Sequence, residues 1–152
     1  MNLRGHDGPS IDDAWANGPR AWVMTAIPGF PNLFTVMGPN SPTGVMSMQH
    51  VAELTARYII GWLRRFRAGE ITTVEITEDA TSRFAERRRG EGTTVWNTGC
   101  NSWSFADDNH IDLWPFDGKR LTRMLTSLMT TSIYSVFDPG LGLAGRCARG
   151  AR

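Results

Sequence analysis

The sequence predicts an α/β domain, in which helices pack against a β-sheet. Three consecutive features carry this prediction: an apolar run at 33–37, a turn rich in Gly and Pro at 38–44, and a long amphipathic pattern at 47–68. A strand, a turn and a helix in this order form the repeating unit of α/β sheets. The chain has 152 residues, which is enough for one domain with its own hydrophobic core.

The residues before this unit predict a short helix and a first strand. Ser10 can cap a helix at 11–17, which a Gly-Pro pair ends. The apolar run at 21–27 is bounded by turn residues, which favours a strand, and PGFPN at 28–32 is a turn signal. The run at 33–37 is apolar almost throughout, so we expect a strand that is buried on both faces.

The helix predicted at 47–68 has a continuous apolar face. Ser47 can cap its start, three arginines lie in its last turns, and Gly69 suits the left-handed position beyond its end. Apolar residues recur every three or four positions, as helical periodicity requires. They are Val51, Leu54, Tyr58, Ile59, Trp62, Leu63 and Phe66.

The second half of the chain has weaker signals. Alternation predicts a strand at 72–77, and an acidic start with a basic end predicts a helix at 78–89. Residues 95–118 are rich in Trp, Gly, Asn and Asp, which is typical of an ordered loop. Residues 119–137 fit either a helix or a strand, and the end at 140–152, rich in Gly, Ala and Arg, is expected to fray.

The composition argues against several classes of protein. It is ordinary for a globular chain, with 41% hydrophobic and 20% charged residues, and a net charge of +1 gives no general attraction to nucleic acid or to an acidic membrane. No apolar run reaches the roughly 18 residues of a membrane span, and the N-terminus lacks the apolar core of a secretory signal. The two cysteines lie far apart, which favours free thiols and a cytoplasmic location.

The sequence lacks the short motifs for phosphate binding, metal binding and hydrolysis. It contains no GxGxxG between a predicted strand and a predicted helix, no GxxxxGK[ST] and no GxSxG. His6, His50 and His110 are far apart and have no neighbouring cysteine pair, so we expect no metal site. The arginines within 64–67 and at 87–89 could bind phosphate, but helix C-termini favour cations in any protein, and this is the preferred interpretation.

Two segments are candidates for ligand binding. The 38–48 segment could turn its backbone N–H groups toward a cofactor at the edge of a sheet, although an ordinary strand–helix turn explains the same pattern better. The segment WNTGCNSWSF at 96–105 could stack an indole on a planar ligand or pin a long loop to the core, and the pattern favours neither. Asp107 and Asp108 are better explained as solvated turn residues than as a carboxylate pair.

Three further stretches form a pattern when they are taken together. The first is Arg4-Gly5 with Ala14-Trp15 and Gly18-Pro19-Arg20, the second is PGFPNLF at 28–34 with GPNSP at 38–42, and the third is Trp96, Gly99-Cys100 and Ser102-Trp103 with LWP at 113–115. In this order and at this approximate spacing, they resemble the C-terminal portion of the class B flavoprotein monooxygenases, the Baeyer–Villiger enzymes. The resemblance covers most of residues 3–118.

The resemblance implies an enzyme that holds FAD in a Rossmann-like domain and NADPH in a second domain. In such enzymes NADPH reduces the flavin, O2 then adds to form a peroxyflavin, and an oxygen atom is inserted next to a ketone carbonyl. The chain would be a C-terminal fragment of the FAD-binding domain. It would contain the FPNLF motif at 30–34 as the last strand of that domain, the long amphipathic helix and an ordered Trp-containing loop.

The resemblance also implies roles for five residues. Thr43, Gly44 and Val45 would line the substrate pocket, and Met48, at the start of the long helix, would contact FAD. The N-terminus of a helix favours the negative charge that develops on a flavin during reduction. Trp103 would contact NADP from a mobile loop that closes the site and excludes water. No catalytic residue is expected in this chain, because the active-site arginine of the family belongs upstream.

The dinucleotide-binding motifs of the family also belong upstream. We therefore expect the chain to need an upstream half that carries them, and to be inactive alone. We assign 1–124 to the FAD-binding region and 125–152 to a divergent, partly disordered tail. The implied partners are a small ketone and O2, with no nucleic acid and no membrane. Two alternatives stay open: a non-catalytic binding or interaction domain derived from such an enzyme, and part of an N-oxygenating flavin monooxygenase.

Overall fold

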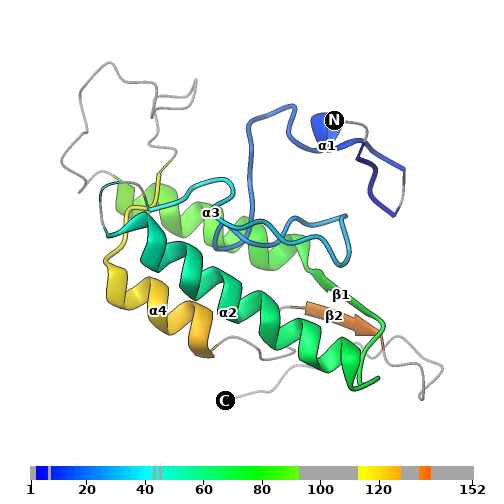
Figure 1. Ribbon diagram of the computed structural model, residues 1–152. Helices are drawn as coiled ribbons and strands as arrows, with labels where there is room; N and C mark the ends of the chain where they lie inside the picture. The colour runs from blue at the N-terminus through cyan, green and yellow to red at the C-terminus, as the bar shows by residue number, and fades with distance from the viewer. Residues whose placement is uncertain are drawn as a thin grey trace, which may run out of the picture.

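The computed structural model of the chain describes residues 3–6, 8–42, 44, 46–92, 113–127 and 134–137. It contains both helices and strands, as the predicted α/β class requires (Figure 1). The elements are α1 (Ile11–Ala14), α2 (Met48–Arg67), β1 (Thr73–Ile76), α3 (Glu78–Gly92), α4 (Gly118–Ser127) and β2 (Tyr134–Phe137). Within the described residues, no helix has both the length and the apolar character needed to cross a lipid bilayer.

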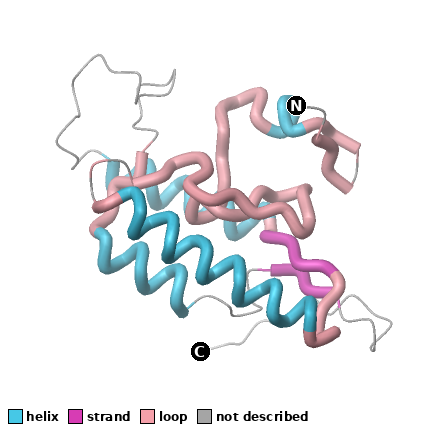
Figure 2. Tube along the Cα trace, viewed as in Figure 1, coloured by secondary structure: helices cyan, strands magenta, loops and turns pink. Residues whose placement is uncertain are grey.

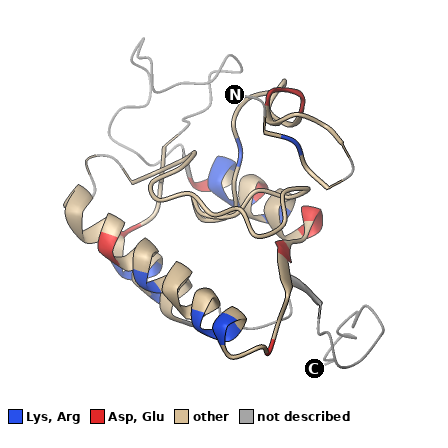
Figure 3. Ribbon diagram, turned by 45° about the vertical axis from the view of Figure 1, so that its right-hand side comes forward, with Lys and Arg blue, Asp and Glu red and all other residues tan. Residues whose placement is uncertain are grey.

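Helix α2 is the central element and confirms the prediction made for 47–68. Ser47 stands at the N-cap position, and Gly69 follows the end with a φ of 73°, in the left-handed region that glycine tolerates. Arginines gather in its last turn, where the helix dipole favours cations (Figure 3). The helix buries Val51, Leu54, Thr55, Tyr58 and Trp62 along one face.

The core lies along this buried face of α2. Helix α4 runs beside α2 and buries Leu121 and Leu125 in the same cluster (Figure 1). Aromatic rings fill two parts of the core. One part consists of Trp22, Tyr58, Trp62 and Tyr134, and the other consists of Phe84, Trp114 and Phe116.

Strand β1 confirms the strand predicted at 72–77, and it pairs with β2 in an antiparallel sheet. The register places Thr73 opposite Phe137 and Ile76 opposite Tyr134. The region 119–137, which fitted either a helix or a strand, thus contains both α4 and β2. Strand β2 lies within the range that we assigned to the tail, and the domain boundary at 124 stays a prediction.

The segments at 21–27 and 33–37 are not strands, and this prediction was wrong. Isolated bridges join Trp22 to Ala26 and Ala26 to Phe34, but no regular ladder forms. Loops make up almost all of the chain between α1 and α2 (Figure 2). All residues of 21–27 are nevertheless buried, so the apolar pattern located part of the core correctly.

A turn from Trp22 to Thr25 and hydrogen bonds between the two segments satisfy their backbone in place of a sheet. The N–H groups of Thr35 and Gly38 donate to the carbonyls of Thr25 and Met24, at 2.8 and 3.2 Å. Val23 and Met24 have φ values of 43° and 55°, in the left-handed region that strands do not use. An apolar pattern specifies burial but not hydrogen-bond partners, so it could not distinguish these turns from a strand.

Smaller differences concern the ends of two helices and the uncertain regions. Helix α1 is shorter than the predicted 11–17, because residues 15–17 form a turn, but Ser10 caps it as predicted through a reciprocal pair of hydrogen bonds with Asp13. Helix α3 continues to Gly92, three residues beyond its predicted end. Most of the Trp-containing loop and all of 140–152 lie outside the described residues.

Candidate functional site

The GPNSP motif forms the approach to α2. Gly38 is needed here, because a Cβ atom would lie 2.2 Å from Oγ1 of Thr35. Asn40 is buried with a φ of 67°, a conformation that asparagine tolerates better than most residues. Oγ of Ser41 donates to the carbonyl of Gly38 at 2.5 Å. The motif therefore adopts a specific local conformation, which sets the path of the chain toward the start of α2.

The start of α2 has the features of a site for an electron-rich group. The side chain of Ser47 makes no capping hydrogen bond and instead contacts Oε1 of Gln49 at 2.8 Å. The first turn contains no acidic residue. The positive end of this 20-residue helix is therefore not neutralised by a side-chain cap or by a carboxylate in its first turn.

The structure describes two of the five predicted site residues. Met48 is the first residue of α2 and its side chain is 50% exposed, so it is accessible to a ligand. Gly44 is exposed in a turn just before the helix, with a φ of 82°. Thr43, Val45 and Trp103 lie outside the described residues. The roles of all five residues in binding substrate, FAD and NADP stay predictions.

Asn32, in the PGFPN turn, attaches this approach to β1, and the sequence patterns did not reveal this role. Its N–H donates to the carbonyl of Val74, and its Oδ1 accepts from the N–H of Val74, both at 2.9 Å. Its Nδ2 also donates to the carbonyl of Thr72 at 3.3 Å. One asparagine with a φ of 61° thereby takes the place of a strand residue beside β1. The sequence signal that could have indicated this role is an asparagine in a turn, because asparagine tolerates the left-handed conformation there.

The first two stretches of the resemblance are in direct contact. The N–H of His6 donates to the carbonyl of Gly29 at 3.1 Å, and the N–H of Gly29 donates to Oε1 of Glu75 at 2.8 Å. Gly5 packs so closely on this turn that a Cβ atom would lie 2.3 Å from the carbonyl oxygen of Gly29. Gly5 therefore allows a close backbone approach that a larger residue would block, whereas Gly29 provides the left-handed φ of 82° that the turn needs.

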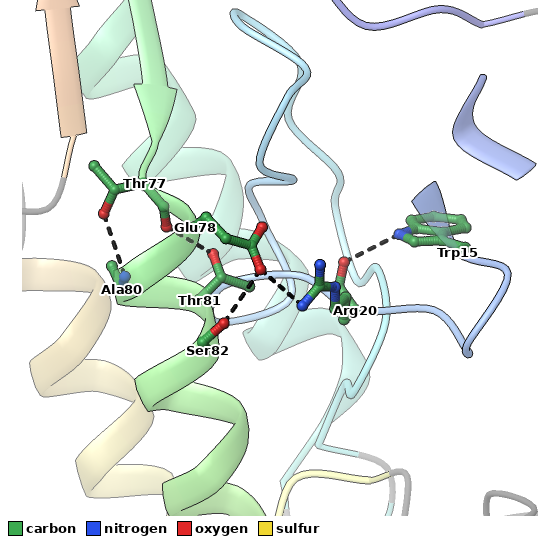
Figure 4. Close-up of polar contacts among 7 residues, drawn as sticks. All are labelled: Trp15, Arg20, Thr77, Glu78, Ala80, Thr81 and Ser82. Atoms are coloured by element: carbon green, nitrogen blue, oxygen red, sulfur yellow. Dashed lines mark hydrogen bonds and ion pairs between the residues drawn. The ribbon is translucent and has the colours of Figure 1, made fainter. Parts of the chain in front are cut away.

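A cavity of about 910 Å³ lies next to this contact, between the N-terminal segment and the corner where β1 meets α3. Nε1 of Trp15 donates to the carbonyl of Arg20 at 3.1 Å, and the guanidinium of Arg20 lies 2.8 Å from Oε1 of Glu78 (Figure 4). The cavity is lined by His6, Ala14, Trp15, Arg20, Ile27, Pro28, Gly29, Glu75, Ile76, Thr77 and Glu78. Sequence reasoning missed it, because its two walls are more than 40 residues apart in the chain.

The titratable groups with clearly raised pKa values lie in the core. The hydroxyls of Tyr58 and Tyr134 hydrogen-bond to each other. Burial raises the pKa of Tyr58 to about 12 and raises the pKa of Tyr134 well above its usual value. Both stay protonated at neutral pH, so the pair is structural. Within the described residues, no group of three or more His, Cys, Asp or Glu side chains could hold a metal ion.

Comparisons of the sequence with known proteins identify monooxygenases as relatives of this chain. The chain is 43% identical over 129 residues to an uncharacterized monooxygenase of Mycobacterium tuberculosis, and the match covers 84% of this chain and 26% of that protein. It is 32% identical over 149 residues to a Baeyer–Villiger monooxygenase of Pseudomonas aeruginosa, covering 95% of this chain and 28% of that protein. No protein-family model matches the chain.

Solved structures agree with this family at the level of the fold. A steroid monooxygenase bound to NADP superimposes with a TM-score of 0.80 at 22% identity, covering 90% of this chain and 27% of that one. The enzyme OTEMO in complex with FAD and NADP gives a TM-score of 0.80 at 20% identity, covering 90% and 26%. The chain therefore matches a C-terminal part of a Baeyer–Villiger-type flavoprotein monooxygenase, which confirms the resemblance.

The chain spans about a quarter of the length of the curated relatives that it matches. The names of the relatives and the ligands of the solved structures agree with the FAD and NADPH that the resemblance implied for the family.

Proposed function

We propose that this chain is the C-terminal portion of an FAD- and NADPH-dependent monooxygenase that inserts oxygen next to a ketone carbonyl. The main support is the match of most of the chain to monooxygenases, one of them named as a Baeyer–Villiger enzyme. When bound, FAD that has been reduced by NADPH supplies the oxygen chemistry. The residues of this chain bind and orient the reactants.

The start of α2 is the part of the described structure that best fits a flavin. Its uncapped N-terminus favours negative charge on the electron-rich edge of the ring, and the exposed Met48 offers an adaptable apolar contact. Gly44 lies in the turn immediately before this site. In this proposal Thr43, Gly44 and Val45 form one wall of the ketone pocket, beside the reacting edge of the flavin.

Trp103 is proposed to contact NADP from a loop that closes over the site. An indole combines a flat apolar face with one N–H donor, which suits a nicotinamide or a ribose. Closure would exclude water from the reacting centre and would favour oxygen insertion over wasteful breakdown of the activated oxygen species. Trp103 lies outside the described residues, so this role rests on the resemblance alone.

The isolated chain is proposed to be inactive. Tight binding of a dinucleotide needs a strand–turn–helix with a glycine-rich loop that receives the pyrophosphate. The GxGxxG at 140–145 is followed by RCARGAR, which lacks the apolar periodicity of the helix in such a unit. The remaining portion of a relative, about three quarters of its length, is the source that we propose for this binding unit.

Complementation tests the proposal. The chain is co-expressed with the remaining portion of the Mycobacterium tuberculosis relative, and bound flavin and ketone-dependent NADPH oxidation are measured. We expect a yellow complex that oxidises NADPH, and Met48→Ala should weaken FAD retention. Leu63→Ala is the matched control, because Leu63 is 53% exposed on the same helix but far from its first turn. Equal losses in both variants would contradict a specific contact between Met48 and the flavin.

The alternative of an interaction domain has one supporting observation. Among the residues that the structure describes, four large apolar side chains are prominently exposed, those of Val36, Met48, Ile60 and Leu63, and an apolar surface of this kind can bind another protein. A complex that forms with the remaining portion but retains no flavin would favour this alternative. Oxidation of amines instead of ketones by a yellow complex would favour N-oxygenation.

A further inference from the structure

The cavity beside the β1–α3 corner combines an apolar wall with a polar rim. Ala14, Trp15, Ile27, Pro28 and Ile76 form the apolar part, and His6, Arg20, Glu75, Thr77 and Glu78 form the polar part. The cavity shares no residue with the 38–48 segment, so an inference about it is independent of the proposed flavin site. A cavity of about 910 Å³ is large enough for a small organic molecule.

Two carboxylates at the rim retain capacity to accept hydrogen bonds. Oε1 of Glu75 accepts from the N–H of Gly29, whereas Oε2 lies 3.8 Å from Nδ1 of His6, which is too far for a hydrogen bond. Oε1 of Glu78 contacts both Arg20 and Ser82. Within the described residues, one carboxylate oxygen of each glutamate therefore accepts no hydrogen bond.

The charges of the lining favour a positive ligand. Glu75 and Glu78 contribute two negative charges, and Arg20 contributes one positive charge that is already paired with Glu78. The two carboxylates and the guanidinium of the lining thus sum to a charge of about −1. The ring of Trp15 adds an electron-rich face, which attracts cations.

We propose that this cavity binds a small organic cation, an ammonium or amidinium group carried on a flat apolar body. The cationic group donates hydrogen bonds to Glu75 and Glu78, and the apolar body lies against Trp15 and Ile27. An anion fits less well, because it would have to displace Glu78 from Arg20 and approach both carboxylates. A bare metal ion fits less well, because no metal-binding group of three or more side chains occurs in the described residues.

Isothermal titration calorimetry of the full chain with benzamidine tests this proposal. Benzamide is a neutral probe of nearly the same shape, and benzoate is a negative one. We expect benzamidine to bind and the other two to bind at least about tenfold more weakly, since loss of one charge-assisted hydrogen bond is of this size. Failure of benzamidine to bind, or equal binding of benzamide, would overturn the proposal.

Two variants locate the site. Glu75→Gln keeps an oxygen for the N–H of Gly29 but removes the charge, and it should weaken benzamidine about tenfold. Glu78→Gln changes an exposed side chain, so it should fold even if the first variant does not, and it should weaken benzamidine while improving benzoate. Glu53→Gln is the control, because Glu53 pairs with Arg57 on α2 and is not part of the cavity. Unchanged benzamidine affinity in Glu78→Gln would refute the site.

Discussion

Raising the pH should unfold this chain through its buried tyrosine pair. The chain contains two tyrosines, Tyr58 and Tyr134, and their hydroxyls hydrogen-bond to each other in the core. Trp22 and Trp62 pack around them, with the ring centroids of Trp62 and Tyr134 4.9 Å apart. Either phenolate would have to form away from water, which is unfavourable.

The size and direction of the effect follow from the pKa of Tyr58. Burial raises this pKa from 10.0 to about 12, and each pKa unit corresponds to about 1.4 kcal/mol. Ionisation of Tyr58 at high pH therefore lowers the free energy of unfolding by up to about 3 kcal/mol. Because the folded pKa lies above the unfolded one, stability is unaffected below pH 10 and is lost as the pH rises toward 12.

Ultraviolet absorbance of the phenolate, followed together with circular dichroism, measures this effect directly. Since the chain has no other tyrosine, the absorbance reports the buried pair alone. We expect little phenolate near pH 10, followed by a joint rise of phenolate and loss of helix near pH 12. Tyr134→Phe leaves Tyr58 as the reporter. Phenolate that forms with a midpoint near pH 10, while the helices remain intact, would refute the burial of the pair.

Two substitutions test the contacts around the PGFPN turn and a third tests helix α3, all by chemical denaturation. Asn32→Ala should lower the free energy of unfolding by about 2 kcal/mol, because it removes two side-chain hydrogen bonds, including that from Val74, and places alanine at a positive φ. Gly5→Ala should cost about 1–3 kcal/mol, because its Cβ would collide with the carbonyl of Gly29. Gly90→Ala, within α3 and with open space around it, should instead gain about 0.5–1 kcal/mol, and a loss there would contradict the helix.

The helices were predictable because their signals repeat over several turns. The apolar face of α2 recurs from Val51 to Trp62 and is bounded by turn residues at both ends, so local preference and burial agree. The segment 21–27 is different, because its apolar residues are buried in turns with left-handed φ values at Val23 and Met24. Which carbonyl a backbone N–H will find depends on distant parts of the chain, and the pattern of residues does not contain this information.

The candidate site was predictable only in part. The resemblance predicts a site at the approach to α2, where the structure shows the tight contacts of Gly38 and the exposure of Met48, and the ligand-binding roles there stay predictions. The anchoring of Asn32 on β1 and the cavity at Glu75 depend on contacts between residues that are about 40 or more positions apart. Spacing along the sequence does not reveal such contacts, because they depend on how the turn packs against the strand.

The central claim is that this chain is one part of a flavin monooxygenase and depends on the remaining part for its cofactor. Titration of the purified chain with FAD, followed by flavin fluorescence and thermal stability, tests this claim most directly. The account predicts no tight binding by the chain alone, and flavin binding with NADPH oxidation once the remaining portion is co-expressed. Micromolar binding of FAD by the chain alone, with a stable yellow product, would contradict the account and would identify a minimal flavoprotein.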